Sequence, residues 1–220
     1  ELGQSGIKVS ELCLGSMTWG SQNSQEDANR QIEISLNHGI NFLDTAEMYP
    51  TTPRSSETQG DSERIIGQWF NKSKQRSNII LATKITGKGF KSIRNGDPIS
   101  ISNLRTALEG SLKRLQTDYI DLYQLHRQSP SIPMDETLRA LDDLVSQGKV
   151  RYIGCSTHPA WAVMESILIS ENKGYVRFVS EQPPYNLLDR RIENELIPVC
   201  EKYGVGIITW APMAMGVLAG

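Results

Sequence analysis

Four side chains suited to proton chemistry stand at or just after the ends of apolar stretches: Asp44, Tyr49, Lys84 and His126. A phenol has a pKa of about 10 and is a weak acid at neutral pH. A neighbouring ammonium group stabilises the phenolate and lowers that pKa, so Lys84 beside Tyr49 would produce a general acid. In this hypothesis Asp44 keeps Lys84 charged and oriented, and His126 donates a hydrogen bond to a substrate carbonyl.

Apolar, β-branched runs alternate with amphipathic stretches along the sequence. The runs predict strands at residues 11–17, 40–44, 78–84, 119–126, 150–156, 177–182 and 205–211. The amphipathic stretches predict helices at residues 25–39, 57–74, 100–116, 134–148, 159–174 and 191–204. This alternation favours a parallel sheet built from βαβ units. No linker divides the chain, so we predict a single domain over residues 1–220.

Two α/β architectures fit this pattern: an open doubly wound sheet and a (β/α)8 TIM barrel. A dinucleotide-binding doubly wound domain should carry a Gly-rich turn after its first strand, and GSMTWGSQNS does not match that fingerprint. Polar residues at the ends of many strands favour the barrel, whose active sites lie at that end. We count seven strands and therefore predict a TIM barrel truncated after the seventh.

Bulk composition excludes several classes of protein. The chain of 220 residues is 38% hydrophobic and 22% charged, with a net charge of -2, so it has no basic field for nucleic acid. No apolar stretch is long enough for a membrane span, and ELGQSGIKVS lacks a signal-peptide core. The three cysteines are far apart and predict neither a disulfide framework nor a metal site. We expect a reduced, cytoplasmic protein.

Three motifs resemble those of the aldo-keto reductase superfamily. They are the strand with Asp and Tyr (GINFLDTAEMY), the lysine strand (LATKI) and the segment ending in a catalytic His (SLKRLQTDYIDLYQLH). The stretch YPTTPRSSETQGDSERIIGQW is similar to the Tas-like bacterial branch, which is related to potassium-channel β-subunits. The resemblance implies that Asp44, Tyr49, Lys84 and His126 form a catalytic tetrad.

The resemblance also implies binding of NADPH (NADP+) without a Rossmann fold. In this reading Asp44 lies beside the cofactor, Thr18 and Trp19 border the nicotinamide, and Trp210 stacks on its ring. The carboxamide would be held by Ser156, Thr157 and Gln182, and the pyrophosphate path would be lined by Ala211, Pro212, Met213 and Ala214. Family members continue beyond this length, so we expect strand eight, the C-terminal loop and the 2'-phosphate site to be absent.

The implied function is NADPH-dependent reduction of aldehydes or ketones to alcohols by hydride transfer, with Tyr49 as general acid. The alternative is a non-catalytic, NADPH-binding redox-sensing subunit like the channel β-subunits. His126 distinguishes the two, because channel-type members of the family commonly carry Asn at this position. A barrel of other chemistry would leave the tetrad unexplained. The expected partner is a small carbonyl substrate, and neither its identity nor the oligomeric state follows from the sequence.

Some remaining residues have structural interpretations. Lys88, Lys91 and Arg94 predict a solvated basic loop, with a mobile lid as the alternative, and Arg127 also reads as a solvated loop residue. Cys155 lies inside a predicted strand and should be a buried, inert thiol.

Overall fold

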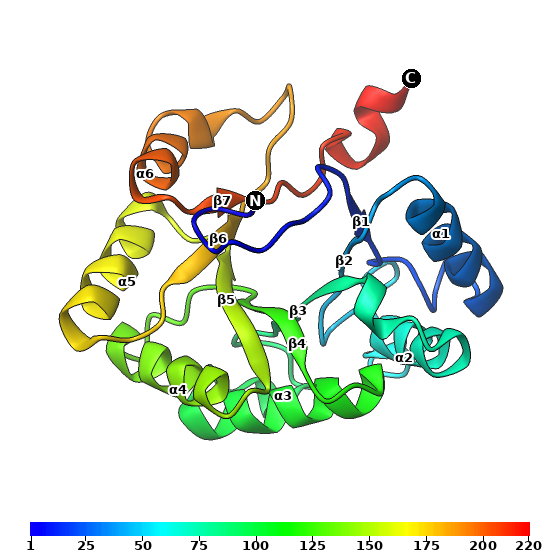
Figure 1. Ribbon diagram of the computed structural model, residues 1–220, viewed down its shortest axis with the longest axis horizontal. Coiled ribbons are helices and arrows are strands. Elements are labelled where there is room, and N and C mark those ends of the chain that lie inside the picture. The colour runs from blue at the N-terminus through cyan, green and yellow to red at the C-terminus, as the bar shows by residue number, and fades with distance from the viewer.

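A computed structural model describes all residues, 1–220, and contains one parallel sheet of seven strands. Neighbours in the sheet follow chain order from β1 to β7, so each strand pairs in parallel with the next. Figure 1 shows the sheet curling inside a ring of helices. The strands are β1 (Cys13–Gly15), β2 (Phe42–Asp44), β3 (Ile80–Ile85), β4 (Ile120–Leu125), β5 (Val150–Ser156), β6 (Phe178–Gln182) and β7 (Gly206–Ile207).

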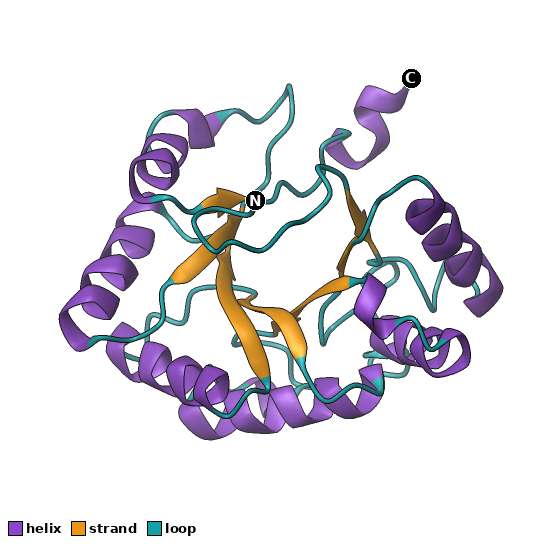
Figure 2. Cartoon of the chain, viewed as in Figure 1, coloured by secondary structure: helices purple, strands orange, loops and turns teal.

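The helices cover the outer face of the curled sheet (Figure 2). The α-helices are α1 (Gln25–Asn37), α2 (Asp61–Ser73), α3 (Ile101–Leu115), α4 (Met134–Ser146), α5 (Ala160–Lys173) and α6 (Leu196–Tyr203). Short 3-10 segments are η1 (Arg76–Asn78), η2 (Arg94–Gly96), η3 (Arg191–Glu193) and η4 (Ala214–Ala219). None of the helices has the length and hydropathy to cross a membrane.

The helical sequences explain why this outer layer forms. In α4, Leu138, Leu141 and Leu144 recur at helical spacing and are buried in the large core cluster. At the start of α1, Ser24 and Asp27 form a reciprocal capping box that satisfies backbone donors of the first turn. Burial of the apolar stripes between sheet and helices is the main stabilising contribution.

Strand alternation divides the side chains between two faces of the sheet. Phe42, Ala82 and Leu122, from three neighbouring strands, form a small inner cluster with Leu2 and Ile7 of the N-terminal segment. The residues two positions later on the same strands are Asp44, Lys84 and Gln124, which lie toward the carboxyl ends. An apolar inner layer therefore supports a polar layer at the edge where parallel strands end.

The seven strands in a curled parallel sheet, with helices alternating between them, confirm the predicted barrel-type α/β fold. Several predicted ends are wrong. The helix predicted from residue 57 begins at Asp61. Gly60, with φ 82, has a left-handed backbone conformation that does not belong to a right-handed helix. The last helix begins at Leu196, which places Pro198 in the first turn, where its missing N–H costs least.

Candidate active site

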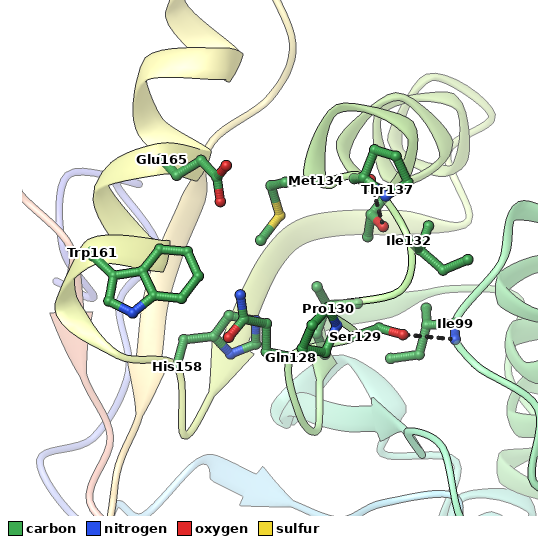
Figure 3. Close-up of a pocket in the computed structure, with 12 residues that line it drawn as sticks. Ile99, Gln128, Ser129, Pro130, Ile132, Met134, Thr137, His158, Trp161 and Glu165 are labelled. Atoms are coloured by element: carbon green, nitrogen blue, oxygen red, sulfur yellow. Dashed lines mark hydrogen bonds between the residues drawn. The ribbon is translucent and has the colours of Figure 1, made fainter.

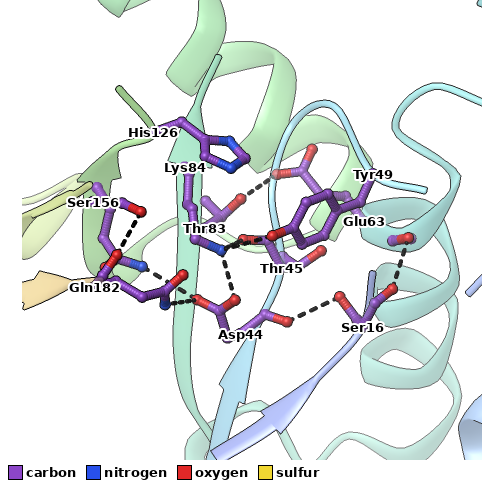
Figure 4. A network of polar contacts seen from close by, with 12 residues as sticks. Ser16, Asp44, Thr45, Tyr49, Glu63, Thr83, Lys84, His126, Ser156 and Gln182 are labelled. Carbon is purple, nitrogen blue, oxygen red and sulfur yellow. Dashed lines mark hydrogen bonds and ion pairs between the residues drawn. The ribbon is translucent and has the colours of Figure 1, made fainter. Parts of the chain in front are cut away.

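Lys84 is the centre of a polar network at the carboxyl edge of the sheet (Figure 4). Its side chain has 0% exposure and its Nζ donates to Asp44 Oδ2 at 2.6 Å and to the Thr45 carbonyl at 2.8 Å. The third partner of Nζ is the Tyr49 hydroxyl, at 3.4 Å. The curled sheet therefore brings together the acid, the cation and the phenol predicted from sequence.

His126 follows β4 and completes this group. Its ring lies edge-on to the Tyr49 ring, with 5.8 Å between centroids and an interplanar angle of 78°. The buried Nδ1 atom of His126 has no protein hydrogen-bond partner. Figure 4 shows the imidazole beside the Lys84 and Tyr49 side chains, so all four residues of the predicted tetrad face one another.

Burial controls the protonation of this network. Burial raises the pKa of Tyr49 above its ordinary value, although the Lys84 ammonium acts in the opposite direction. Burial alone would lower the pKa of Lys84, but the Asp44 carboxylate outweighs it and the net shift is upward. Burial, with Lys84 nearby, lowers the pKa of His126 well below 6.5. At neutral pH the site therefore holds a phenol, an ammonium ion and a neutral imidazole.

The sequence argument expected a Tyr49 pKa below its ordinary value. Lys84 acts in that direction, but burial is the larger effect and the net shift is upward. The Lys84 ammonium lies 0.8 Å closer to the Asp44 carboxylate than to the phenol, as the distances of 2.6 Å and 3.4 Å show. The carboxylate also raises the Tyr49 pKa directly. Desolvation of the phenol consequently outweighs the cation.

Two amide side chains hold the second oxygen of Asp44. Gln182 Nε2 donates to Asp44 Oδ1 at 3.0 Å, and Gln124 Nε2 donates to the same atom at 3.2 Å. Sequence analysis missed Gln124, although a polar residue two positions before His126 in an otherwise apolar strand was a usable signal. These amides orient the carboxylate so that Oδ2 points at Lys84.

The predicted cofactor residues separate into three groups. Ser156 and Gln182 adjoin the tetrad network, and Ser156 Oγ donates to the Gln182 carbonyl at 2.8 Å. Thr157 and Trp210 lie farther out; the Trp210 side chain is 37% exposed. The four residues that follow it contribute no hydrogen bond to the tetrad and lie in a partly to fully exposed segment; they are Ala211, Pro212, Met213 and Ala214.

Trp19 does not fit its predicted place beside a nicotinamide ring. The side chain is only 1% exposed, belongs to the main core cluster and donates from Nε1 to Gln31 of α1 at 2.8 Å. No ring surface remains for a cofactor, because the first loop folds Trp19 back against α1. Its neighbour Thr18 donates to Asn23 within the same loop.

The expected solvated basic loop is wrong for Arg94. This side chain forms an ion pair with the buried Glu47 and also donates to the Thr86 carbonyl at 2.8 Å. A carboxylate just after β2 thus anchors the loop after β3. Arg127, also expected to be solvated, is exposed but donates to Thr157 Oγ1 at 2.7 Å.

Comparison with known proteins agrees with this geometry. The sequence model of the aldo/keto reductase family matches residues 11–220. The chain belongs to the aldo/keto reductase family. It is 39% identical to Protein tas of Escherichia coli over 98% of this chain and 68% of that protein. It is 38% identical to the uncharacterized oxidoreductase YrpG of Bacillus subtilis over 100% of this chain and 67% of that protein.

The family also includes relatives that are named for a different role. This chain is 35% identical to a probable voltage-gated potassium channel subunit beta of Oryza sativa, over 100% of this chain and 65% of that protein. The chain thus spans about two thirds of the length of these relatives. Family membership and the oxidoreductase names support an oxidoreductase, while the channel subunits show that the family includes proteins named for another role.

Proposed function

We propose that this chain belongs to an NADPH-dependent enzyme that reduces aldehydes or ketones to alcohols. The observation that carries the proposal is the placement of Lys84 Nζ between the Asp44 carboxylate and the Tyr49 hydroxyl, with His126 beside the phenol. A binding role alone would not require an acid, a buried cation and a neutral imidazole to converge on one phenol.

The residues present fit a nicotinamide cofactor. His126 Nδ1 is buried without a protein partner, and the half-exposed Trp210 leaves part of its ring surface free for stacking. Ser156 and Gln182 would hold the carboxamide. When bound, NADPH supplies a hydride equivalent to the carbonyl carbon.

The protein residues then transfer a single proton to the carbonyl oxygen. Tyr49 keeps its proton at neutral pH, because burial raises its pKa. The neutral His126 imidazole donates one N–H toward the carbonyl oxygen and polarises it. As negative charge develops on that oxygen, the oxygen becomes a stronger base than a phenolate and takes the Tyr49 proton. Lys84 stabilises the phenolate that remains, and Asp44 holds Lys84 in place.

The second candidate is a cofactor-binding regulatory subunit, favoured by the similarity to potassium channel subunits beta. The complete protein, mixed with NADPH and a panel of aromatic aldehydes and ketones, distinguishes the two. Loss of the reduced-nicotinamide absorbance, dependent on the carbonyl compound, supports the reductase. Saturable NADPH binding without turnover on any member of the panel would reject it and favour the subunit.

A further inference from the structure

Outside the tetrad, three buried side chains with metal-binding atoms converge behind the ends of β5 and β6: Cys155, His158 and Glu181. Cys155 Sγ, a ring nitrogen of His158 and a carboxylate oxygen of Glu181 all lie within 4.8 Å of one another. The exposures of Cys155, Glu181 and His158 are 0%, 0% and 3%. Cys155 and His158 are three residues apart around the end of β5, whereas Glu181 lies on the next strand, so the spacing along the chain does not by itself predict a metal site.

Two atoms of this cluster lack partners. Glu181 Oε2 and His158 Nε2 are both buried and accept or donate no hydrogen bond. The other polar atoms are engaged: Glu181 Oε1 accepts from the His158 backbone N–H at 3.0 Å, and His158 Nδ1 contacts the Ser156 carbonyl at 3.0 Å. A buried polar atom without a partner destabilises the folded state. A cation bound by both atoms would remove that destabilisation.

The existing contacts are also those that a metal site requires around its ligands. With Nδ1 directed at the Ser156 carbonyl, Nδ1 carries the proton and Nε2 is left as the free lone pair. The Glu181 carboxylate is oriented by the His158 backbone amide. The second coordination layer is therefore already present.

We propose that Cys155, His158 and Glu181 form a zinc-binding site. Thiolate, imidazole and carboxylate are the ligands of Zn²⁺, and the usual bond lengths place tetrahedral ligand atoms about 3.4–3.6 Å apart. The ligand atoms lie within 4.8 Å of one another, so binding would draw them together by up to about 1.4 Å. Binding forms three metal–ligand bonds and releases the Cys155 thiol proton to solvent.

A cavity of about 200 Å³ between the β4–α4 loop and the start of α5 gives the site an approach from solvent (Figure 3). His158 lines this cavity together with the exposed Trp161 and Glu165, whereas no residue of the tetrad lines it. Figure 3 shows His158 at the end of the cavity where Trp161 and Gln128 also lie. A water molecule in this cavity would complete a four-coordinate metal.

The position suggests what the metal does. Cys155 and Glu181 are paired across β5 and β6, and the next pair in the register is Ser156 and Gln182. Because side chains alternate along strands, one pair faces the helices and the other faces the tetrad. A bound zinc would clamp the two strand ends from behind and fix Ser156 and Gln182, the residues assigned to the carboxamide.

The test is metal binding to the complete protein, measured without activity. Chelator-treated protein is titrated with Zn²⁺ by calorimetry and with Co²⁺ by absorbance, where a thiolate–cobalt charge-transfer band reports Cys155. We expect one equivalent of each metal and the thiolate band. Cys155→Ser and His158→Asn should each weaken Zn²⁺ binding by more than about 100-fold, since even outer-layer changes cost 10–100-fold.

Cys200→Ser is the matched control, because Cys200 is also a buried thiol but is not part of the cluster. It should retain the metal stoichiometry and the band. Glu181→Gln supplies a third variant in case one of the first two does not fold, as judged by circular dichroism. Binding below about 0.2 equivalents in the wild type, or binding equally strong in every folded variant, would overturn the proposal.

Discussion

At the scale of single residues, the two buried tyrosines of the barrel provide a contrast. Tyr49 OH contacts Lys84, whereas Tyr123 OH is buried without a partner. Removing an unpaired buried hydroxyl removes the cost of taking that group out of water, which the folded state otherwise bears. We expect Tyr123→Phe to leave the free energy of unfolding unchanged or to raise it by about 1 kcal/mol, measured by urea denaturation. A fall of similar size would show that the hydroxyl has a partner in solution.

The contribution of Lys84 to stability depends on a single partner, the Asp44 carboxylate. Lys84→Met leaves Asp44 buried without its cation, which costs about 3–5 kcal/mol in the free energy of unfolding. Asp44→Asn added to Lys84→Met removes the stranded charge, so the double variant should recover part of that loss. Strict additivity of the two single changes, measured in a double-mutant cycle, would contradict the ion-pair account.

Sequence reasoning works well at this scale where residue types are chemically unusual. Lys84 ending a buried strand is informative, because a lysine is rarely buried without a partner. Trp19 and Arg94 were misjudged for the opposite reason. An aromatic residue and an arginine in loops have several favourable environments, and only the folded loops bring Gln31 and Glu47 to them.

At the scale of elements, the approach of α2 to the end of α3 is set by a glycine. A Cβ at Gly67 would lie 2.2 Å from the Arg114 carbonyl oxygen and 2.8 Å from the Leu115 carbonyl carbon. Both are backbone atoms, so the helices would have to separate. Gly67→Ala should lower the free energy of unfolding by about 1–3 kcal/mol, measured by chemical denaturation.

Gly110 of α3 is the matched control for that substitution. A Cβ there meets only side-chain atoms of Arg114, the nearest being Nη1 at 3.1 Å, and no backbone atom. Because alanine favours helices over glycine, Gly110→Ala should be neutral or stabilising by up to about 1 kcal/mol. Equal destabilisation by the two substitutions would mean that helix propensity, not the close approach, governs both sites.

The type and order of the helices and strands were predictable, because the spacing of apolar residues and the length of each stretch distinguish strand from helix. The ends of these elements were less predictable. β7 has only two residues, Gly206 and Ile207, although the apolar sequence continues through Trp210. Hydrophobicity reports burial, while strand length depends on which neighbouring backbone groups are available for pairing, and a single sequence does not contain that information.

At the scale of the whole molecule, His126 and His158, both held neutral by the fold, should make the free energy of unfolding fall in acid. Burial lowers the pKa of His126 well below 6.5 and that of His158 to about 4. Below pH 6.5 the unfolded chain therefore binds more protons than the folded one. Each histidine then reduces the free energy of unfolding by up to about 1.4 kcal/mol per pH unit as the pH falls toward its folded pKa.

The measurement is urea denaturation from pH 7.5 to pH 5 in buffer with a chelator. His126→Asn removes one of the two groups, so its unfolding free energy should decline less steeply between pH 6.5 and pH 5 than that of the wild type. Parallel curves for the two proteins would show that His126 takes up its proton equally in the folded and unfolded states, so that folding does not lower its pKa.

The arrangement of the whole molecule was predictable only in outline. Continuous apolar strands alternating with helices indicate a parallel sheet, and the polar strand ends favour a barrel. The sequence could not show that the curled sheet places Cys155, His158 and Glu181 together, because that depends on the β5–β6 register and the turn after β5. Sites formed by registers and turns become visible only in three dimensions.

The central claim is that Tyr49 gives its proton to a carbonyl oxygen, and the most direct test compares Tyr49→Phe with Tyr123→Phe in the complete protein. Both changes remove one buried hydroxyl, and only the first touches the tetrad. The account predicts that Tyr49→Phe retains NADPH binding but loses about 10²–10⁴-fold in kcat for an aromatic aldehyde, while Tyr123→Phe keeps wild-type turnover. Turnover by Tyr49→Phe within a few-fold of the wild type would contradict the account.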